Sequence, residues 1–253
     1  MNNVHQPQSR VFVALDVPTF EEAKKLVNEL STDAVLYKVG LQLLHTSGPK
    51  VLKMLQNEGK HVFIDAKFND IPNTVHNAVT AISSFNPWGF TVHASGGKEM
   101  MKQAVLAVEK KMTLKASSSN DGSHDISPRV IAVTLLTSFD QESVTKELLV
   151  RESIETYTIH LANLAKQSGC NGIVCSGHEI EQIKQQTNGN LLAIVPGVRP
   201  SGMNSHDQRR VVTVTDAINK GADFIVIGRP ILTSAKKRLA LESILTEVNR
   251  CLQ

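Results

Sequence analysis

Three charged side chains lie close together in one short stretch of the sequence. The apolar run at 62–64 is followed by Asp65, Lys67 and Asp70. On an extended strand, side chains two residues apart point to the same face, so Asp65 and Lys67 are predicted to face the same way, with Asp70 in the following turn. Two carboxylates beside one ammonium hold a lysine charged and in place, which suits proton delivery or repulsion of an anion. The alternative is a solvated surface ion pair, the commoner role of an isolated Asp-x-Lys sequence.

A second group of residues could bind a phosphate. Gly228 and Arg229 follow an apolar run, and a glycine amide at a helix N-terminus beside a guanidinium favours an anion. Arg199 and Gln208 follow the preceding apolar run and could close over the same group. The alternative for Gly228 is that it only allows a tight turn between a strand and a helix.

The sequence has no pattern for metal or covalent chemistry. It contains no His-x-His, no His-Glu-x-x-His and no Gly-x-Ser-x-Gly sequence. His93 stands alone at the end of a predicted strand, where a structural hydrogen bond is its commoner role, and Cys175 lies in an apolar run that is predicted to be core. The residues therefore predict proton chemistry on a phosphorylated substrate, with no cofactor and no metal.

Eight short apolar runs, each followed by a segment with helical periodicity, must position these residues. Strands are predicted at 11–15, 34–40, 61–65, 89–93, 129–134, 172–175, 191–195 and 224–228. Polar side chains gather where the runs end: Asp16, Lys38, Asp65, Lys67, His93, Thr137, Ser176, Arg199, Gly228 and Arg229. A (β/α)8 TIM barrel brings these ends to one face, where such barrels keep their active sites. The runner-up, an open doubly wound sheet, lacks a Gly-x-Gly-x-x-Gly after the first strand.

The same pattern sets the domain boundaries. Residues 1–10 are predicted to be a flexible lead-in, and residues 11–253 a single barrel domain. Residues 115–127 are rich in serine and poor in apolar side chains, which predicts a surface loop. Helices are predicted to begin after Thr19 as N-cap, after Gly48-Pro49, and at Pro72.

The composition excludes several classes of protein. A net charge of +3 over 253 residues is too small to indicate nucleic-acid binding. No apolar stretch reaches the length of a membrane span, and the first residues do not resemble a signal peptide. Three cysteines without a Cys-x-x-Cys pattern indicate neither a disulfide framework nor a zinc site. These features predict a cytoplasmic protein.

The sequence resembles the orotidine 5'-phosphate decarboxylase family. The segment Asp-Ala-Lys-Phe-Asn-Asp-Ile-Pro-Asn-Thr at 65–74 is similar to the family signature. Similar segments also lie at 13–16, 36–40, 92–97, 132–138, 172–176, 196–200, 207–210 and 226–230. Ala66 stands where the family often has leucine, and the serine-rich loop at 116–123 is long, but neither departure touches a catalytic position. The resemblance implies a TIM barrel of the bacterial type that converts orotidine 5'-phosphate to UMP and CO2 without a cofactor, the last step of de novo pyrimidine nucleotide biosynthesis.

The resemblance also implies a role for each residue of the site. Lys67 would donate the proton to C6 of the substrate as CO2 leaves, and Asp16 and Lys38 would contact the ribose. Asp70 and Ile71 would come from the other subunit of a homodimer. The catalytic charge network would consist of Lys38, Asp65, Lys67 and Asp70. The remaining substrate-binding residues would be Pro72, Asn73 and Thr74 in the signature, Thr137 and Arg199 around the ligand, and Gln208, Gly228 and Arg229 at the phosphate.

Two other functions stay open. A metal-dependent sugar-phosphate decarboxylase or aldolase on a similar barrel is disfavoured by residues 71–74 and Gln208, and activity insensitive to EDTA would exclude it. A silent nucleotide-binding barrel would need a lost catalytic residue, and every implied one is present. Such a protein would bind UMP tightly without decarboxylating the substrate.

Overall fold

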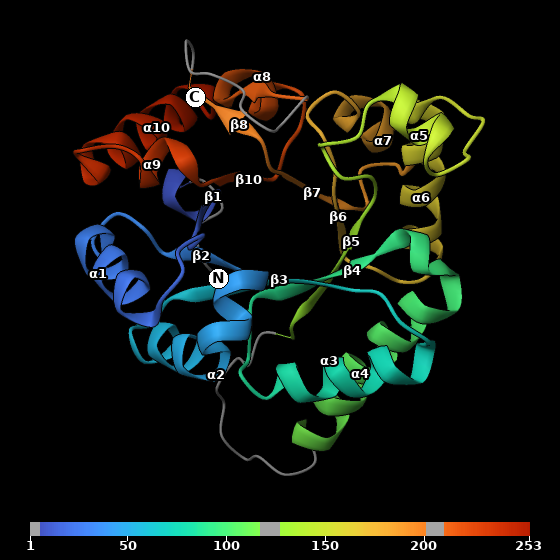
Figure 1. Ribbon diagram of the computed structural model, residues 1–253, viewed down its shortest axis with the longest axis horizontal. Helices are drawn as coiled ribbons and strands as arrows, with labels where there is room; N and C mark the ends of the chain where they lie inside the picture. Colours follow the sequence, from blue (N-terminus) through green and yellow to red (C-terminus); the bar gives the residue numbers. More distant parts are fainter. Residues whose placement is uncertain (1–5, 117–126, 201–209) are drawn as a thin grey trace.

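Eight parallel strands close into a barrel in the computed structural model, which describes residues 6–116, 127–200 and 210–253 (Figure 1). The strands are β1 Val11–Ala14, β2 Leu36–Gly40, β3 His61–Phe68, β4 Gly89–His93, β5 Arg129–Val133, β6 Gly172–Val174, β7 Leu192–Val195 and β10 Phe224–Ile227. They pair in chain order, and β10 closes the ring between β7 and β1. The predicted (β/α)8 barrel is therefore confirmed, and each of its eight strands lies within a few residues of its predicted position.

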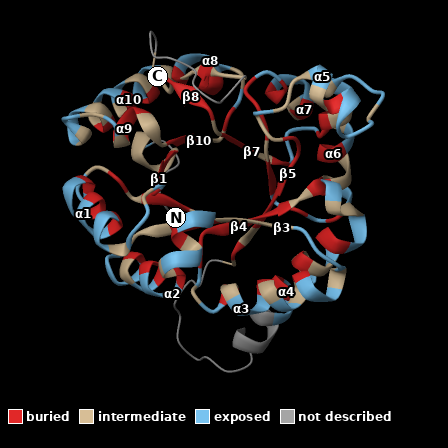
Figure 2. Cartoon of the chain, in the orientation of Figure 1, coloured by how far each residue is buried: buried red, intermediate tan, exposed pale blue. Residues whose placement is uncertain are grey.

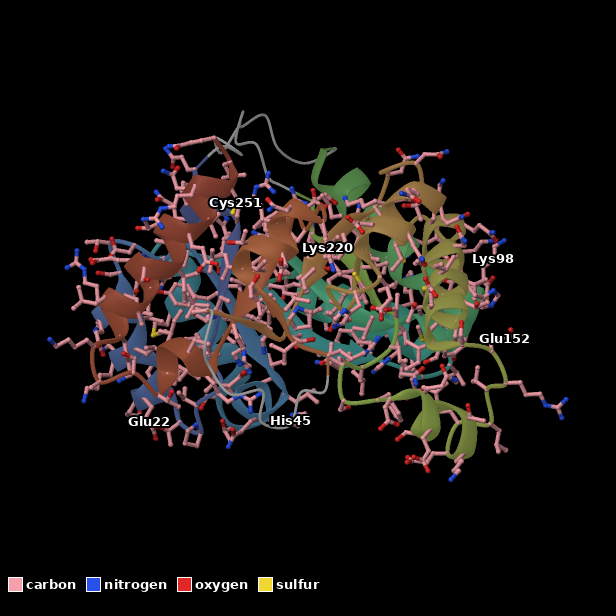
Figure 3. All side chains as sticks on the ribbon, turned by 90° about the horizontal axis from the view of Figure 1, so that it is seen from above. Glu22, His45, Lys98, Glu152, Lys220 and Cys251 are labelled. Atoms are coloured by element: carbon pink, nitrogen blue, oxygen red, sulfur yellow. The ribbon has the colours of Figure 1, made fainter. Side chains whose placement is uncertain are left out.

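Helices form the outer ring around these strands (Figure 1). They are α1 Phe20–Leu30, α2 Leu41–Asn57, α3 Pro72–Ser83, α4 Gly97–Ala116, α5 Gln141–Lys146, α6 Ile154–Gln167, α7 Ile180–Gln186, α8 Val214–Asn219, α9 Arg229–Leu232 and α10 Lys237–Cys251. Thr19 caps α1 as predicted, because its side chain accepts a hydrogen bond from the backbone N–H of Glu22 at 3.2 Å. Figure 3 shows the labelled charged residues Glu22, Lys98 and Glu152 on the outside of the molecule. None of the helices in the described part of the chain is long and apolar enough to cross a membrane.

Three parts of the fold differ from the sequence-based prediction. The helix predicted to begin after Gly48-Pro49 begins at Leu41, because two helical segments join at a kink where Ser47 has φ −153° and ψ 16°. Proline fits the first turn of the second segment, where its missing N–H has no intrahelical acceptor to lose. The short helix α5 and the two-stranded sheet of β8 Val198–Arg199 and β9 Val212–Thr213 were not predicted.

The start of the chain packs against the barrel from residue 7 onward. Pro7–Ser9 form a 3-10 helix, η1, and the Arg10 guanidinium donates hydrogen bonds to the carbonyls of Ala222 and Asp223 at 3.2 and 3.4 Å. Residues 1–5 of the predicted flexible lead-in and 117–126 of the predicted serine-rich loop lie outside the described residues.

The barrel interior is filled by side chains that alternate along the strands. Its core cluster consists of Phe12, Ala14, Leu36, Phe63, Trp88, Ile131, Ile194 and Val226. A second, larger core lies between the strands and the helices, and Figure 2 shows most of the strands buried, whereas the second half of β3 is only partly buried. On β1 the inward positions are Phe12 and Ala14, and Asp16 follows in the same alternation just after the strand; on β3 they run from Phe63 to Asp65. The alternation that builds an apolar floor therefore also places charged side chains above it.

We expect the Phe12→Ala substitution to lower the free energy of unfolding by about 3–5 kcal/mol. Phe12 has no exposed surface, and its ring centroid lies 4.9 Å from Trp88, 5.2 Å from Phe63 and 5.3 Å from Phe224. Urea unfolding followed by circular dichroism measures the change. The control is Leu239→Ala at a half-exposed position, where a change within about 0.5 kcal/mol is expected. A loss no larger in Phe12→Ala than in this control would contradict the prediction.

Candidate active site

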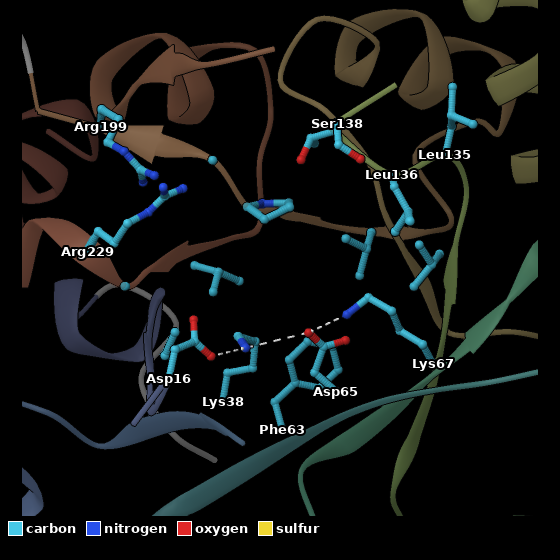
Figure 4. A pocket seen from close by; sticks show the side chains of 18 residues that line it. Asp16, Lys38, Phe63, Asp65, Lys67, Leu135, Leu136, Ser138, Arg199 and Arg229 are labelled. Carbon is cyan, nitrogen blue, oxygen red and sulfur yellow. Dashed lines mark hydrogen bonds and ion pairs between the residues drawn. The ribbon is translucent and has the colours of Figure 1, made fainter. Parts of the chain in front are cut away.

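A cavity of about 320 Å³ opens at the carboxyl ends of the barrel strands (Figure 4). Its floor is apolar and includes Ala14, Phe63 and Val226. Eight of the predicted site residues line it together: Asp16, Lys38, Asp65, Lys67, Thr137, Arg199, Gly228 and Arg229. Volumes of this size accommodate small ligands.

Four charged side chains of alternating sign form a row along one side of this cavity (Figure 4). The Lys38 Nζ lies 3.0 Å from Asp16 Oδ1 and 3.6 Å from Asp65 Oδ2, and the Lys67 Nζ lies 2.8 Å from the same Asp65 oxygen. The strand register explains the row. Lys38 pairs with Ala14 on β1 and with Phe63 on β3, so each aspartate lies two residues beyond a direct partner of Lys38 and on the same face.

The row keeps Lys38 and Asp65 charged. Burial by itself would lower the pKa of Lys38, but the carboxylates of Asp65 and Asp16 outweigh it and hold that pKa above its ordinary value. Burial would raise the pKa of Asp65, but the charges of Lys38 and Lys67 and two hydrogen bonds hold it below its ordinary value. Burial and the nearby Lys67 charge lower the pKa of His93, so its ring is neutral near pH 7.

Lys67 reaches Asp65 through an irregular backbone and not through regular strand alternation. Lys67 has a left-handed φ of 51°, which is uncommon for a residue other than glycine. The pairs Ile64–Phe90 and Phe68–Val92 are four residues apart on β3 but two apart on β4, so β3 bulges at this point. The prediction that Asp65 and Lys67 face the same side is confirmed, but the bulge was not predicted.

Two arginines form the opposite end of the cavity. In Figure 4 the guanidinium groups of Arg199 and Arg229 lie beside one another, on the opposite side of the cavity from Lys67. Arg199 lies in β8 and is 5% exposed, and its Nη1 donates to the carbonyl of Val198 at 3.0 Å. Gly228 precedes the four-residue helix α9, which begins with Arg229. Two adjacent guanidinium groups at one end of a cavity favour a dianion such as a phosphate.

A buried ion pair holds the cavity wall that carries Thr137. Arg210 pairs with Glu179, and its Nη2 donates to the backbone carbonyls of Leu135 and Leu136 at 3.4 and 3.2 Å. Burial raises the pKa of Glu179 above its ordinary value, although Arg210 pulls it down. The ion pair therefore ties the residues just before β9 and the loop after β6 to the wall at Leu135 and Leu136.

The second half of the signature lies outside the cavity of its own chain. Asp70 is exposed, and its Oδ1 accepts a hydrogen bond from the backbone N–H of Ile71 at 2.6 Å. Five predicted site residues do not line the cavity: Asp70, Ile71, Pro72, Asn73 and Thr74. Asp70 and Thr74 instead line a hollow of about 440 Å³ between α2 and α3, and Ile71 beside it is 68% exposed. Within one chain, the row therefore contains two carboxylates and not three.

Gln208 lies outside the described residues, so the structure does not place it. The structure adds wall residues that were not predicted, among them Phe63, Leu135, Leu136, Ser138 and Pro196. It also adds Thr91, whose side chain contacts both Asp65 and Lys67. Among the described residues, no three His, Cys, Asp or Glu side chains group as a metal ion would require.

We expect the contribution of Asp65 to the free energy of unfolding to decrease at acidic pH. The folded pKa of Asp65 lies below the ordinary value of 3.8, so its ionised form stabilises the fold above that pH and this contribution is lost as the pH falls through the folded pKa. Urea unfolding of the wild type and of Asp65→Asn from about pH 7 to about pH 3 measures the difference. The free energy of unfolding of the wild type should fall relative to that of Asp65→Asn as the pH is lowered. A difference between the two proteins that stays constant with pH would contradict the expectation.

Comparisons with known proteins agree with this geometry. Residues 9–244 match the model of the orotidine 5'-phosphate decarboxylase / HUMPS family. The chain is 39% identical to the orotidine 5'-phosphate decarboxylase of Pseudoalteromonas translucida over 98% of this chain and 99% of that protein. It is 38% identical to that of Moorella thermoacetica, over 95% of this chain and 92% of that protein.

A solved structure gives the same result. The crystal structure of orotidine 5'-phosphate decarboxylase from Lactobacillus acidophilus superposes with a TM-score of 0.80 at 32% identity, covering 95% of this chain and 99% of that one. The family match covers most of the chain, and the sequence and structural similarities extend over the same length. The chain therefore belongs to the orotidine 5'-phosphate decarboxylase / HUMPS family.

Proposed function

We propose that this protein decarboxylates orotidine 5'-phosphate to UMP and CO2 without a cofactor, as the last step of de novo pyrimidine nucleotide biosynthesis. One observation carries the proposal: the ammonium of Lys67 ends a buried row of alternating charges at one side of a cavity whose other end holds two arginines. Relatives of nearly full length that are named for this reaction support it.

Residues at different places in the cavity would have different roles in the reaction. Arg229 and Arg199 would bind the phosphate, and Asp16 and Lys38 would contact the ribose. The bond between C6 and the carboxylate carbon breaks, which leaves its electron pair on C6 as CO2 departs. The Lys67 ammonium donates a proton to C6, and the neutral amine recovers a proton from water. The apolar floor at Phe63 and Val226 limits water beneath the reacting atoms.

The magnitude of charge repulsion decides which residue contributes most. A carboxylate about 4 Å from the substrate carboxylate repels it by roughly 4 kcal/mol at an effective dielectric constant near 20. Complete relief of this repulsion accounts for about 10³ in rate, whereas enzyme accelerations reach ~10¹⁷. Repulsion by Asp65 is therefore a minor contribution. Stabilisation of the charge that develops at C6 by Lys67, in a preorganised site, is the larger one.

The position of Asp70 supports a homodimer in which each subunit completes the other's site. Asp70 is exposed and does not line its own cavity, and Ile71 exposes 68% of its surface. The hollow between α2 and α3 is lined mainly by apolar side chains such as Leu44 and Ile82, which a second copy would cover. In a two-fold dimer the same patch meets itself, so Asp70 and Ile71 of each chain would reach the neighbouring cavity.

The direct test uses purified protein, orotidine 5'-phosphate and EDTA. Ultraviolet absorbance should fall as the substrate is consumed, at the same rate with and without the chelator. Absorbance loss abolished by EDTA would favour a metal-dependent sugar-phosphate enzyme. Tight binding of UMP without any absorbance loss would favour a silent nucleotide-binding barrel. Either result would overturn the proposal, while the cytoplasmic location stays a separate prediction.

A further inference from the structure

We propose that Thr91 is a positioning residue for both Asp65 and Lys67, because one buried hydroxyl sets the place of the carboxylate and of the lysine backbone. The inference rests on the proposed function for its kinetic consequences, but its geometric basis does not. Thr91 lies in the middle of β4, has no exposed surface and is absent from the residues that line the cavity. It therefore acts through its neighbours and not on a substrate.

The Thr91 hydroxyl makes two hydrogen bonds of opposite direction. Its oxygen accepts from the backbone N–H of Lys67 at 2.8 Å, and its proton is donated to Asp65 Oδ1 at 3.0 Å. The other oxygen of Asp65, Oδ2, is left for Lys67 Nζ at 2.8 Å and Lys38 Nζ at 3.6 Å. A hydroxyl both donates and accepts hydrogen bonds. It can therefore fix the orientation of the Asp65 carboxylate and the position of the Lys67 backbone together.

The bulge in β3 explains why this hydroxyl is needed. Between Ile64 and Phe68 the strand carries two more residues than β4 opposite it, so the backbone N–H of Lys67 has left the regular ladder. A partly buried N–H without a partner destabilises the fold, and the left-handed backbone of Lys67 adds strain to that cost. The hydroxyl offsets part of this cost by replacing the missing ladder carbonyl. It thereby holds Lys67 in the conformation from which its ammonium meets Asp65.

A matched pair of substitutions separates positioning from packing. Thr91→Val keeps the shape of the side chain and removes the hydroxyl, whereas Thr91→Ser keeps the hydroxyl and removes a methyl group. We expect Thr91→Val to lower kcat by about 10–100-fold with KM for orotidine 5'-phosphate changed by less than about threefold, because the phosphate contacts remain. Thr91→Ser should retain most of the wild-type kcat. Thr158→Val, at another fully buried threonine whose hydroxyl bonds the carbonyl of Ile154 in α6, should leave kcat unchanged.

A second readout does not depend on turnover. Carbon NMR of labelled aspartate follows the titration of the Asp65 carboxylate in the folded protein. Without the hydrogen bond to its ionised form, Asp65 should titrate at a higher pH in Thr91→Val than in the wild type, and at the wild-type pH in Thr91→Ser. An unchanged titration in a folded Thr91→Val variant would overturn the positioning role, as would equal loss of kcat in the valine and serine variants. Absence of wild-type turnover would overturn the proposed function alone, because the titration would still test Thr91.

Discussion

The Lys67→Ala variant should turn over orotidine 5'-phosphate at least roughly 10⁴-fold more slowly than the wild type. Two losses combine in this variant. A positioned general acid contributes about 10²–10⁴ in rate, and a charge that stabilises the transition state contributes about 10²–10³ more. The ammonium of Lys67 lies 2.8 Å from Asp65 in the cavity. Among the described residues that line the cavity, Lys38 is the only other lysine.

Steady-state absorbance assays at high protein concentration measure this loss. Binding of UMP should weaken much less than turnover, since Arg199 and Arg229 are untouched. The control is Lys53→Ala, which removes an exposed lysine from α2 and should keep the wild-type rate. A Lys67→Ala enzyme within about tenfold of the wild-type kcat would remove Lys67 from the mechanism.

Mixed dimers should recover activity that neither parent has. A dimer of one Lys67→Ala subunit and one Asp70→Ala subunit contains one site with both substitutions and one site with neither, if Asp70 serves the neighbouring chain. Heterodimers isolated by two different affinity tags should therefore show about half of the wild-type activity, although each parent homodimer is nearly inactive. The physical reason is the exposure of Asp70 outside the cavity that its own chain forms.

The matched control for mixed dimers combines Lys67→Ala with Asp65→Ala. Both residues belong to the cavity of one chain, so every site in that heterodimer carries a substitution and no recovery is expected. Heterodimers of Lys67→Ala and Asp70→Ala that stay as inactive as their parents would place Asp70 in its own subunit's site. The exposed Ile71 would then need another explanation.

The sequence predicted the barrel well because its signals are local. A continuous apolar run such as 224–227 ending at a glycine and an arginine is typical of a strand buried on both faces, and Thr19 with Glu22 marks a helix start by its own chemistry. Asp16, Lys38 and Asp65 stand at or near the ends of their apolar runs, and the barrel rule that strand ends meet at one face placed them together. The short elements α5, β8 and β9 carry too few residues for a periodic pattern.

What the sequence could not predict depends on contacts between strands. Thr91 is one β-branched residue among others in a predicted strand, and its role follows from the register of β3 against β4. The left-handed φ of Lys67 has no local signal, since lysine does not favour that conformation. The Arg210–Glu179 pair joins residues 31 positions apart, and neither residue has a local pattern that indicates its partner.

The bulge at Lys67 also limits how this chemistry could be transplanted into a designed protein. A copy of Asp65 and Lys67 on a regular strand of another barrel would space their Cα atoms roughly 7 Å apart along a straight ladder, with the lysine amide paired to the next strand. The ammonium of the copied lysine would then lie in a different position relative to the aspartate. The unit to transfer is therefore the strand pair β3 and β4, with the extra residues of the bulge and the Thr91 hydroxyl. The linear motif alone would supply the same residue types without their geometry.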